Sequence, residues 1–192
     1  MIYLALLILI LPLLGTLILL YIQSSSRKLS IFVSNISILL SFLISIYLLY
    51  LYFTSSYEPL SRDILVFANV QTFSLAFGLY IDSLSLMMSA VVTSVSLLVH
   101  YYSISYMKDE SSYNRFFVYT NFFTFSMLLI VFSNNFFQLF IGWELVGLSS
   151  YLLIGFWIKK DSAVKANYKA FLVNRVGDVG LILGLCLILI SY

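Results

Sequence analysis

The sequence predicts an all-α, polytopic membrane protein with six transmembrane helices and one short β-hairpin between the second and third helices. Of its 192 residues, 62% are hydrophobic and only 9% are charged, and the mean hydropathy is +1.05. Soluble domains carry about 25% charged residues, and no soluble fold buries so much apolar surface in so few residues. We therefore expect residues 1–192 to form a single membrane domain.

Six apolar stretches are each about as long as a helix that crosses a bilayer, which needs about 20 residues. The first stretch lacks the basic leader and the small-residue cleavage site of a signal peptide, so we expect it to be retained as a helix. The fourth is short and the sixth is long, which predicts a tight turn after the fourth and a tilted sixth helix. The predicted spans are residues 3–22, 31–53, 82–105, 116–132, 136–158 and 164–191.

The segment Ser61–Tyr80 is too polar and too interrupted to be a span. Within it, Ile64–Phe67 and Thr72–Phe77 have the composition of two short strands separated by a turn. This pattern predicts a β-hairpin at the membrane surface. Asp82 follows, and we expect it to cap the third helix, because the positive end of the helix dipole favours a carboxylate.

Basic residues are unequally divided between the loops. The loops after the first, third and fifth helices contain seven, whereas the loops after the second and fourth contain only Arg62. The positive-inside rule places the basic loops on the inner side. Both termini then face outward, which in a mitochondrion is the intermembrane space. The seven basic residues are Arg27, Lys28, Lys108, Arg115, Lys159, Lys160 and Lys165.

The sequence offers no redox or hydrolytic site of its own. A single cysteine, Cys186, excludes an intrachain disulfide and a zinc or iron–sulfur cluster built by this chain alone. No glycine-rich phosphate loop follows a strand, so we expect no nucleotide site. The sequence therefore predicts no catalytic residue, metal ligand or bound cofactor in this chain, no nucleic-acid partner, and contact with membrane lipids.

Glu144 lies in the middle of the fifth span. At about 1.5 Å per residue, its carboxyl group is roughly 12 Å from either end of the helix. The side chain is too short to reach the surface, so it needs a cation, a proton or a wet cavity. A structural carboxyl remains possible, but ionisable groups at this depth are usually functional. We therefore interpret Glu144 as a proton-relay or ion-coupling carboxylate.

Four further residues are proton-relay candidates. Arg175 and Asp178 lie three residues apart on the sixth span and share a face, so they can pair. Such a pair suits helix docking or structural neutralisation as well as coupling. Lys169 is deep enough for a relay. His100, near the end of the third span, either bonds within a helix bundle or lies on a proton path, since its pKa is naturally near neutral.

Three long motifs occur in order along the chain: HYYSISYM at residues 100–107, GWELVGLSSYLLIGFW at 142–157 and KAFLVNRVGD at 169–178. They resemble the third, fifth and sixth helices of subunit 5 of NADH dehydrogenase, an antiporter-like subunit of respiratory complex I. The large subunit of multisubunit Na⁺/H⁺ antiporters shares the Trp-Glu and SYLLIGFW stretches. The NRVGD run at 174–178 favours the complex I family.

The resemblance implies a membrane-arm subunit in the mitochondrial inner membrane that takes part in proton translocation coupled to NADH:ubiquinone electron transfer. Flavin, iron–sulfur clusters and ubiquinone would then bind elsewhere in the complex. Glu144 would pair with a lysine on a broken seventh helix, Arg175 and Asp178 would be the matching charges, and His100 would lie near the proton routes. The alternatives are a Na⁺/H⁺ antiporter subunit and a structural element without its own proton path.

Family members have many more helices than this sequence. The broken helix with its lysine, the second helical repeat and the lateral helix are all absent. Either the sequence is a fragment of a longer subunit, or the subunit is split between two chains. Because the chain starts at Met1, we favour a split subunit whose remaining helices are on a separate chain. The expected partners are that chain, the neighbouring antiporter-like subunit and other subunits of the membrane arm.

Overall fold

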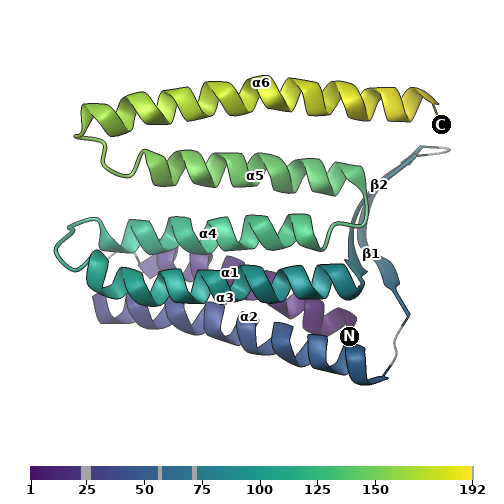
Figure 1. The fold of residues 1–192 in the computed structure, drawn as a ribbon, viewed down its shortest axis with the longest axis horizontal. Coiled ribbons are helices and arrows are strands. Elements are labelled where there is room, and N and C mark those ends of the chain that lie inside the picture. Colours follow the sequence, from purple (N-terminus) through teal and green to yellow (C-terminus); the bar gives the residue numbers. More distant parts are fainter. Residues whose placement is uncertain (23–26, 56–57, 71–72, 192) are drawn as a thin grey trace.

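The described part of the chain forms six helices that lie side by side, with a β-hairpin across one end (Figure 1). The computed structural model describes all residues except 23–26, 56–57, 71–72 and 192. The predicted number and order of elements are confirmed, and helix ends differ from the prediction by at most four residues. The elements are α1 (Ile2–Ile22), α2 (Arg27–Ser55), β1 (Leu60–Val70), β2 (Phe73–Ile81), α3 (Ser83–Tyr106), α4 (Tyr113–Val131), α5 (Phe136–Ile154) and α6 (Asp161–Ser191).

Five of these helices, all except α4, are long and apolar enough to cross a membrane, so the chain is a multi-pass membrane protein. The polar residues Asn114, Arg115 and Asn121 lower the hydropathy of α4. This helix contacts α1, α2, α3 and α5, and a helix surrounded by others can carry polar groups that lipid would not accept. That α4 also crosses the membrane stays a prediction, which its central position supports.

Pro12 interrupts the hydrogen bonding of α1, and α2 repairs the gap. Proline has no backbone N–H, so the carbonyl of Ile8, four residues earlier, loses its partner within the helix. The Ser41 hydroxyl of α2 donates to this Ile8 oxygen at 3.2 Å. In an apolar membrane interior an unbonded carbonyl is costly, and a serine on a neighbouring helix can satisfy it. Ser41 thereby compensates for the proline in α1.

A polar layer separates two apolar clusters in the bundle of α1–α4. One cluster packs under the hairpin and the other packs where α3 connects to α4. Between them Asn121 donates to Ser34 at 3.0 Å, and Ser45 is 3.0 Å from Thr93. These bonds join α4 to α2 and α2 to α3, so the first four helices are held together by hydrogen bonds as well as by apolar packing.

The hairpin is attached to the turn between α4 and α5. The Gly78 N–H of β2 donates to Gln138 Oε1 at 2.8 Å, and the Tyr80 N–H donates to the Phe132 oxygen at 3.0 Å. The strands are longer than predicted, because register shifts after Asp63 and Val66 let pairing continue past irregular positions. Two residues of the predicted hairpin lie outside the described residues: Gln71, which belongs to the predicted turn, and Thr72, with which the predicted second strand begins.

Asp82 caps α3 as predicted. Its Oδ1 accepts the Ser85 N–H at 2.7 Å, and the Ser85 hydroxyl accepts the Asp82 N–H at 2.9 Å. This reciprocal arrangement is a capping box, which satisfies two backbone donors at the start of a helix. The carboxylate is therefore explained by the local structure of α3.

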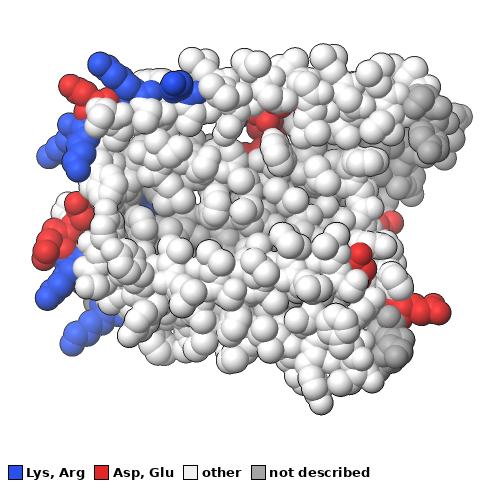
Figure 2. Space-filling model, in the orientation of Figure 1, with Lys and Arg blue, Asp and Glu red and all other residues white. Residues whose placement is uncertain are grey.

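The basic loops lie together at one end of the bundle. Figure 2 shows Lys and Arg gathered at the edge opposite the hairpin, where α2 and α6 begin and α3 and α5 end. We refer to Arg27, Lys28, Lys108, Arg115, Lys159, Lys160 and Lys165 as the basic edge. The beginning of α1 and the end of α6 lie at the opposite end (Figure 1). The compartment that faces each end stays a prediction.

Gly142 sets the close approach of α5 to α4. A Cβ atom at this position would lie 2.7 Å from Ile130 Cγ1 and 3.1 Å from the Ile130 backbone nitrogen. We expect Gly142→Ala to separate the two helices and to lower the free energy of unfolding by about 1–3 kcal/mol, measured by thermal denaturation of the solubilised protein. Gly147→Ala is the matched control, because its nearest neighbour would be 3.7 Å away. Equal shifts in both variants would contradict this explanation.

Candidate functional site

The candidate site lies along the contact between α5 and α6, which we call the α5–α6 seam. The two helices run in opposite directions and are joined by a short turn (Figure 1). Residues spaced by three or four positions project from the same face of a helix, and one such stripe on each helix forms the seam. The facing pairs are Gly155 with Asn167, Tyr151 with Phe171, Gly147 with Asn174, and Trp143 with Asp178.

Three charged groups meet midway along this seam. Arg175 Nη1 lies 2.6 Å from Glu144 Oε2 and 3.9 Å from Asp178 Oδ2. The indole N–H of Trp143 donates to Asp178 Oδ1 at 3.1 Å. Figure 2 shows acidic atoms at this level, far from the basic edge. The predicted contact of Arg175 with Asp178 on one face is confirmed, and Glu144 finds its cation on the neighbouring helix. We call Glu144, Arg175 and Asp178 the charge cluster.

The charge cluster contains one cation for two carboxyl groups. With both carboxylates ionised its formal charge is −1, which is unfavourable within a bilayer. The Asp178 side chain is 9% exposed, Glu144 is 22% exposed and Arg175 is 52% exposed. The cluster is therefore accessible from the side of α6. A proton or a second cation at this place would make it neutral.

A small hollow of about 150 Å³ adjoins the charge cluster. Ser150 and Asn174 contribute polar groups to its wall, and Asp178 closes one side. Gly147 leaves this space open, because a larger side chain at that position would reach toward Asn174. A polar hollow of this size can hold a few water molecules, which need two to four polar partners each. The hollow is lined by Trp143, Val146, Gly147, Ser150, Asn174 and Asp178.

Lys169 lies on α6 but is not part of the charge cluster. It precedes Arg175 by six residues, or about 9 Å along the helix, toward the basic edge. Its side chain is exposed, and no ion pair joins it to an acid in the described part of the chain. Its role as a relay stays a prediction.

His100 belongs to a different group of residues. Its ring is almost completely buried, and its Nδ1–H donates to the Ser96 oxygen at 2.7 Å. Nε2 is 3.4 Å from the Thr120 hydroxyl, and Ser96 is 2.6 Å from Thr124. This group lies in the polar layer between α3 and α4. Among the described residues no hydrogen bond connects it to the charge cluster, so the five candidates do not form one site.

Several residues of the seam were not identified from the sequence. Trp143, Asn174 and Phe171 each contact a residue on the facing helix. The signal that was available is the four-residue spacing of Trp143, Gly147, Tyr151 and Gly155, which forms one stripe on α5. Such a stripe identifies a contact face, but the register of the facing helix must be known before its partners can be named.

Two family models match the chain. The model described as "NADH-Ubiquinone oxidoreductase (complex I), chain 5 N-terminus" matches residues 67–117. The model described as "NADH:quinone oxidoreductase/Mrp antiporter, TM" matches residues 133–191. The second match includes all of α5 and α6, and with them the charge cluster.

Similar proteins occur in bacteria and fungi. NADH-quinone oxidoreductase subunit L of Neisseria meningitidis is 47% identical over 82% of this chain and 23% of its own length. Subunit L of Rickettsia typhi is 42% identical over 97% of this chain and 29% of its own length. NADH-ubiquinone oxidoreductase chain 5 of Allomyces macrogynus is 44% identical over 80% of this chain and 24% of its own length. The chain thus spans about a quarter of the length of these relatives.

A solved structure shares the fold. A chain of the membrane-bound sulfane sulfur reductase, an archaeal respiratory membrane complex, superimposes with a TM-score of 0.78. The match covers 94% of this chain and 36% of the other chain at 19% sequence identity. At that identity the likeness concerns the arrangement of the helices and the hairpin.

Proposed function

The chain belongs to the family of complex I chain 5 and subunit L, whose N-terminal region it matches, and on this basis we propose that it is an antiporter-like subunit of an NADH:quinone oxidoreductase. Its proposed role is proton translocation driven by redox chemistry in other subunits. The observation that carries the proposal is the charge cluster, in which Glu144 and Asp178 share the cation Arg175 midway along α5 and α6.

The missing positive charge suggests how the cluster works. Arg175 is bound to both carboxylates, so it neutralises one of them. When a lysine from the remaining helices approaches, both carboxylates stay ionised and the cluster is neutral. When that lysine withdraws, one carboxylate takes up a proton, because an unbalanced charge in the bilayer is costly. Movement of a cation is thereby converted into uptake and release of a proton.

The exposure of α6 supports the expectation of further helices. Among the described helices α6 contacts only α5, and the side chain of Arg175, midway along α6, is half exposed. An arginine that faced lipid there would cost about 3 kcal/mol or more. We propose that the rest of the antiporter-like fold covers α6 and supplies the lysine. The proposed partners also include the neighbouring antiporter-like subunit.

We propose the mitochondrial inner membrane as the location of the protein. The chain is rich in Phe (17) and Tyr (15) and poor in Pro (2) and Gly (8), a bias that is typical of AT-rich organellar genomes. Under the positive-inside rule the basic edge then faces the matrix. A fungal relative named NADH-ubiquinone oxidoreductase chain 5 is compatible with this location.

One specific observation favours a second candidate function. The description of the family model that matches α5 and α6 names both NADH:quinone oxidoreductases and Mrp antiporters. The charge cluster would then serve Na⁺/H⁺ exchange without NADH. The match of residues 67–117 to the N-terminus of complex I chain 5 supports the redox-linked function instead.

Native gel electrophoresis of solubilised membranes, with mass spectrometry of the band that contains this chain, tests the proposal. We expect a band of complex I size that oxidises NADH and contains flavin and iron–sulfur subunits together with the remaining antiporter-like helices. A peptide that crosses the end of the present sequence shows that those helices continue the same polypeptide, whereas their presence only in other peptides indicates a second chain. A small complex with sodium-dependent exchange and without flavin would refute the proposal.

A further inference from the structure

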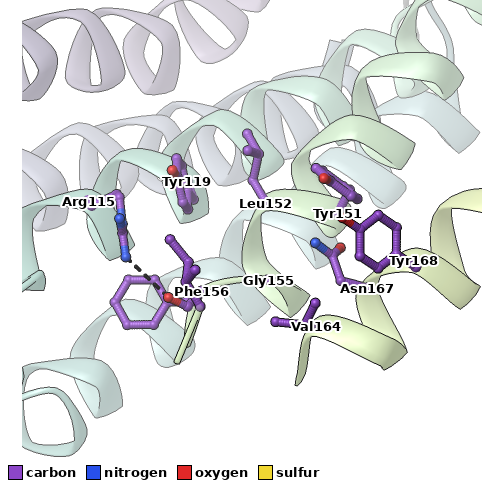
Figure 3. Close-up of a pocket in the computed structure, with 10 residues that line it drawn as sticks. Arg115, Tyr119, Tyr151, Leu152, Gly155, Phe156, Val164, Asn167 and Tyr168 are labelled. Carbon is purple, nitrogen blue, oxygen red and sulfur yellow. Dashed lines mark hydrogen bonds between the residues drawn. The ribbon is translucent and has the colours of Figure 1, made fainter. Parts of the chain in front are cut away.

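A second hollow near the basic edge is lined by residues of α4, α5 and α6 (Figure 3). Its volume is about 260 Å³, and its wall contains Arg115 from α4 and Asn167 from α6. Figure 3 shows the Asn167 amide beside Tyr151 and Tyr168, with Arg115 at the far end of the hollow.

Two polar atoms in this hollow lack partners. Arg115 Nη2 donates to the Phe156 oxygen at 3.1 Å, but Arg115 Nε and Asn167 Oδ1 are buried and have no hydrogen bond within the described residues. Buried polar atoms in folded proteins are almost always bonded to protein or to ordered water. A hollow of this volume, with these polar groups in its wall, has room for several water molecules. Water therefore satisfies these atoms best.

The two hollows occupy successive levels of the α5–α6 seam. From the basic edge inward, α6 presents Asn167 to the first hollow and then Asn174 and Asp178 to the second. The distance from Asn167 to Asp178 along the helix is about 16 Å. Polar side chains thus extend from the basic edge to the charge cluster along a single helix face.

One aromatic contact separates the hollows. The rings of Tyr151 and Phe171 lie 5.4 Å apart between centroids, at the level between Asn167 and Asn174. Arg175 Cζ lies 5.2 Å from the centroid of the Phe171 ring, within the range of a cation–π interaction. The guanidinium that pairs with Glu144 therefore also contacts the ring of Phe171.

The other grooves of the chain have a different character. One lies between α3 and α4 and reaches His100, and another lies between α2 and α3, but apolar side chains form most of both walls. Neither groove is lined by a member of the charge cluster. Water and protons are poorly accommodated by such surfaces, so the α5–α6 seam is the better route.

We propose that the α5–α6 seam is a water-filled route that carries protons between the basic edge and the charge cluster, with the Tyr151–Phe171 contact as its gate. The gate opens when Arg175 leaves the Phe171 ring, which couples proton access to the charge state of Glu144. The proton moves through water and is taken up by a carboxylate of the cluster, and no other bond changes. This inference rests on the proposed function, because it assigns an access route to the same charge cluster.

Cysteine accessibility tests the route without any need for turnover. In the complete membrane complex with Cys186→Ser, Asn167→Cys reports on the first hollow and Ser150→Cys reports on the second. Leu153→Cys is the matched control, because it lies three residues from Ser150 but faces the apolar groove between α3 and α4. A small, charged, membrane-impermeant thiol reagent is added from the basic edge of oriented vesicles, and labelling rates are measured.

We expect Asn167→Cys to react rapidly, Ser150→Cys slowly and Leu153→Cys not at all. When Phe171→Ala is added to the Ser150→Cys variant, we expect the labelling rate at position 150 to rise about tenfold. This factor corresponds to about 1.4 kcal/mol, which is within the range for loss of an aromatic contact. The rate at position 167 should stay unchanged. Phe171→Leu serves the same purpose if the alanine variant does not assemble.

Three results would overturn the inference: no labelling at position 167, equal labelling at positions 150 and 153, or no effect of either Phe171 variant at position 150. The proposed function can fail separately. If Glu144→Gln does not alter proton pumping while the labelling pattern is as expected, the route exists but the cluster does not pump. If pumping depends on Glu144 and the seam is unreactive, protons reach the cluster another way.

Discussion

Replacement of Glu144 by Gln is expected to lower the number of protons pumped per electron while the complex still assembles. Glutamine keeps the shape of the side chain but can neither carry the negative charge nor exchange a proton. We expect proton transfer through this subunit to fall by roughly 10²-fold, the lower end of the range for loss of a positioned acid–base group. The measurement is the proton-to-electron ratio in vesicles that oxidise NADH.

Glu58→Gln is the matched control for this variant. Glu58 is an exposed carboxylate just before β1, outside both the seam and the polar layer, so its replacement should leave the proton-to-electron ratio unchanged. A normal ratio in Glu144→Gln would refute the coupling role. If less of the Glu144→Gln complex assembles, but the complex that does assemble has a normal proton-to-electron ratio, the role of the carboxyl group is purely structural.

Replacement of Arg175 by Gln is expected to have the largest effect on stability. It leaves Glu144 and Asp178 without their cation. Because we propose that further helices cover α6 in the complete subunit, breaking the ion pair there should cost roughly 3 kcal/mol, the lower end of the range for buried pairs. The double variant Glu144→Gln, Arg175→Gln removes one of the two stranded charges and should recover part of that loss. We expect a coupling energy of about 0.5–3 kcal/mol between the two sites, measured by thermal denaturation of all four proteins.

Lys165→Gln is the control for this cycle. Lys165 is an exposed cation in the first part of the same helix, and surface changes of this kind usually alter stability by less than about 0.5 kcal/mol. If Arg175→Gln is no more destabilising than Lys165→Gln, the short contact of Arg175 with Glu144 contributes little. If the two replacements in the cycle are additive, the residues do not interact in the assembled membrane protein.

The helices and the hairpin were predictable because their signals are local. A helix that crosses a bilayer must be apolar over a length set by the membrane, and the interrupted segment before Asp82 cannot meet that condition. Asp82 itself was predictable as a cap, because a helix start leaves backbone donors that a carboxylate satisfies. Helix α4 was predicted as well, although its polar residues lower its hydropathy. The reason it can carry them, its contacts with four other helices, cannot be read from composition.

The candidate site was only partly predictable. Glu144, Arg175 and Asp178 were identified because charges within an apolar span are conspicuous, and the three-residue spacing correctly placed two of them on one face. His100 was grouped with them on the same grounds, yet its hydrogen bonds lie in the polar layer between α3 and α4. Trp143 and Phe171 carry no charge and resemble any lipid-facing aromatic residue, so nothing in their type indicated a role.

The sequence by itself determined that this chain is a multi-pass membrane protein, which segments form its helices, and that carboxylates and cations lie within apolar helices. These properties depend on the free energy of transferring each segment from water into lipid. That free energy is the sum of contributions from the residues of one continuous segment, so it can be read from the sequence. The tertiary structure alone decided that Arg175 binds Glu144, that Trp143 binds Asp178, and that two polar hollows follow one another along the α5–α6 seam. Such contacts depend on the register and distance between separate helices, which are set by packing at sites such as Gly142 and Gly155.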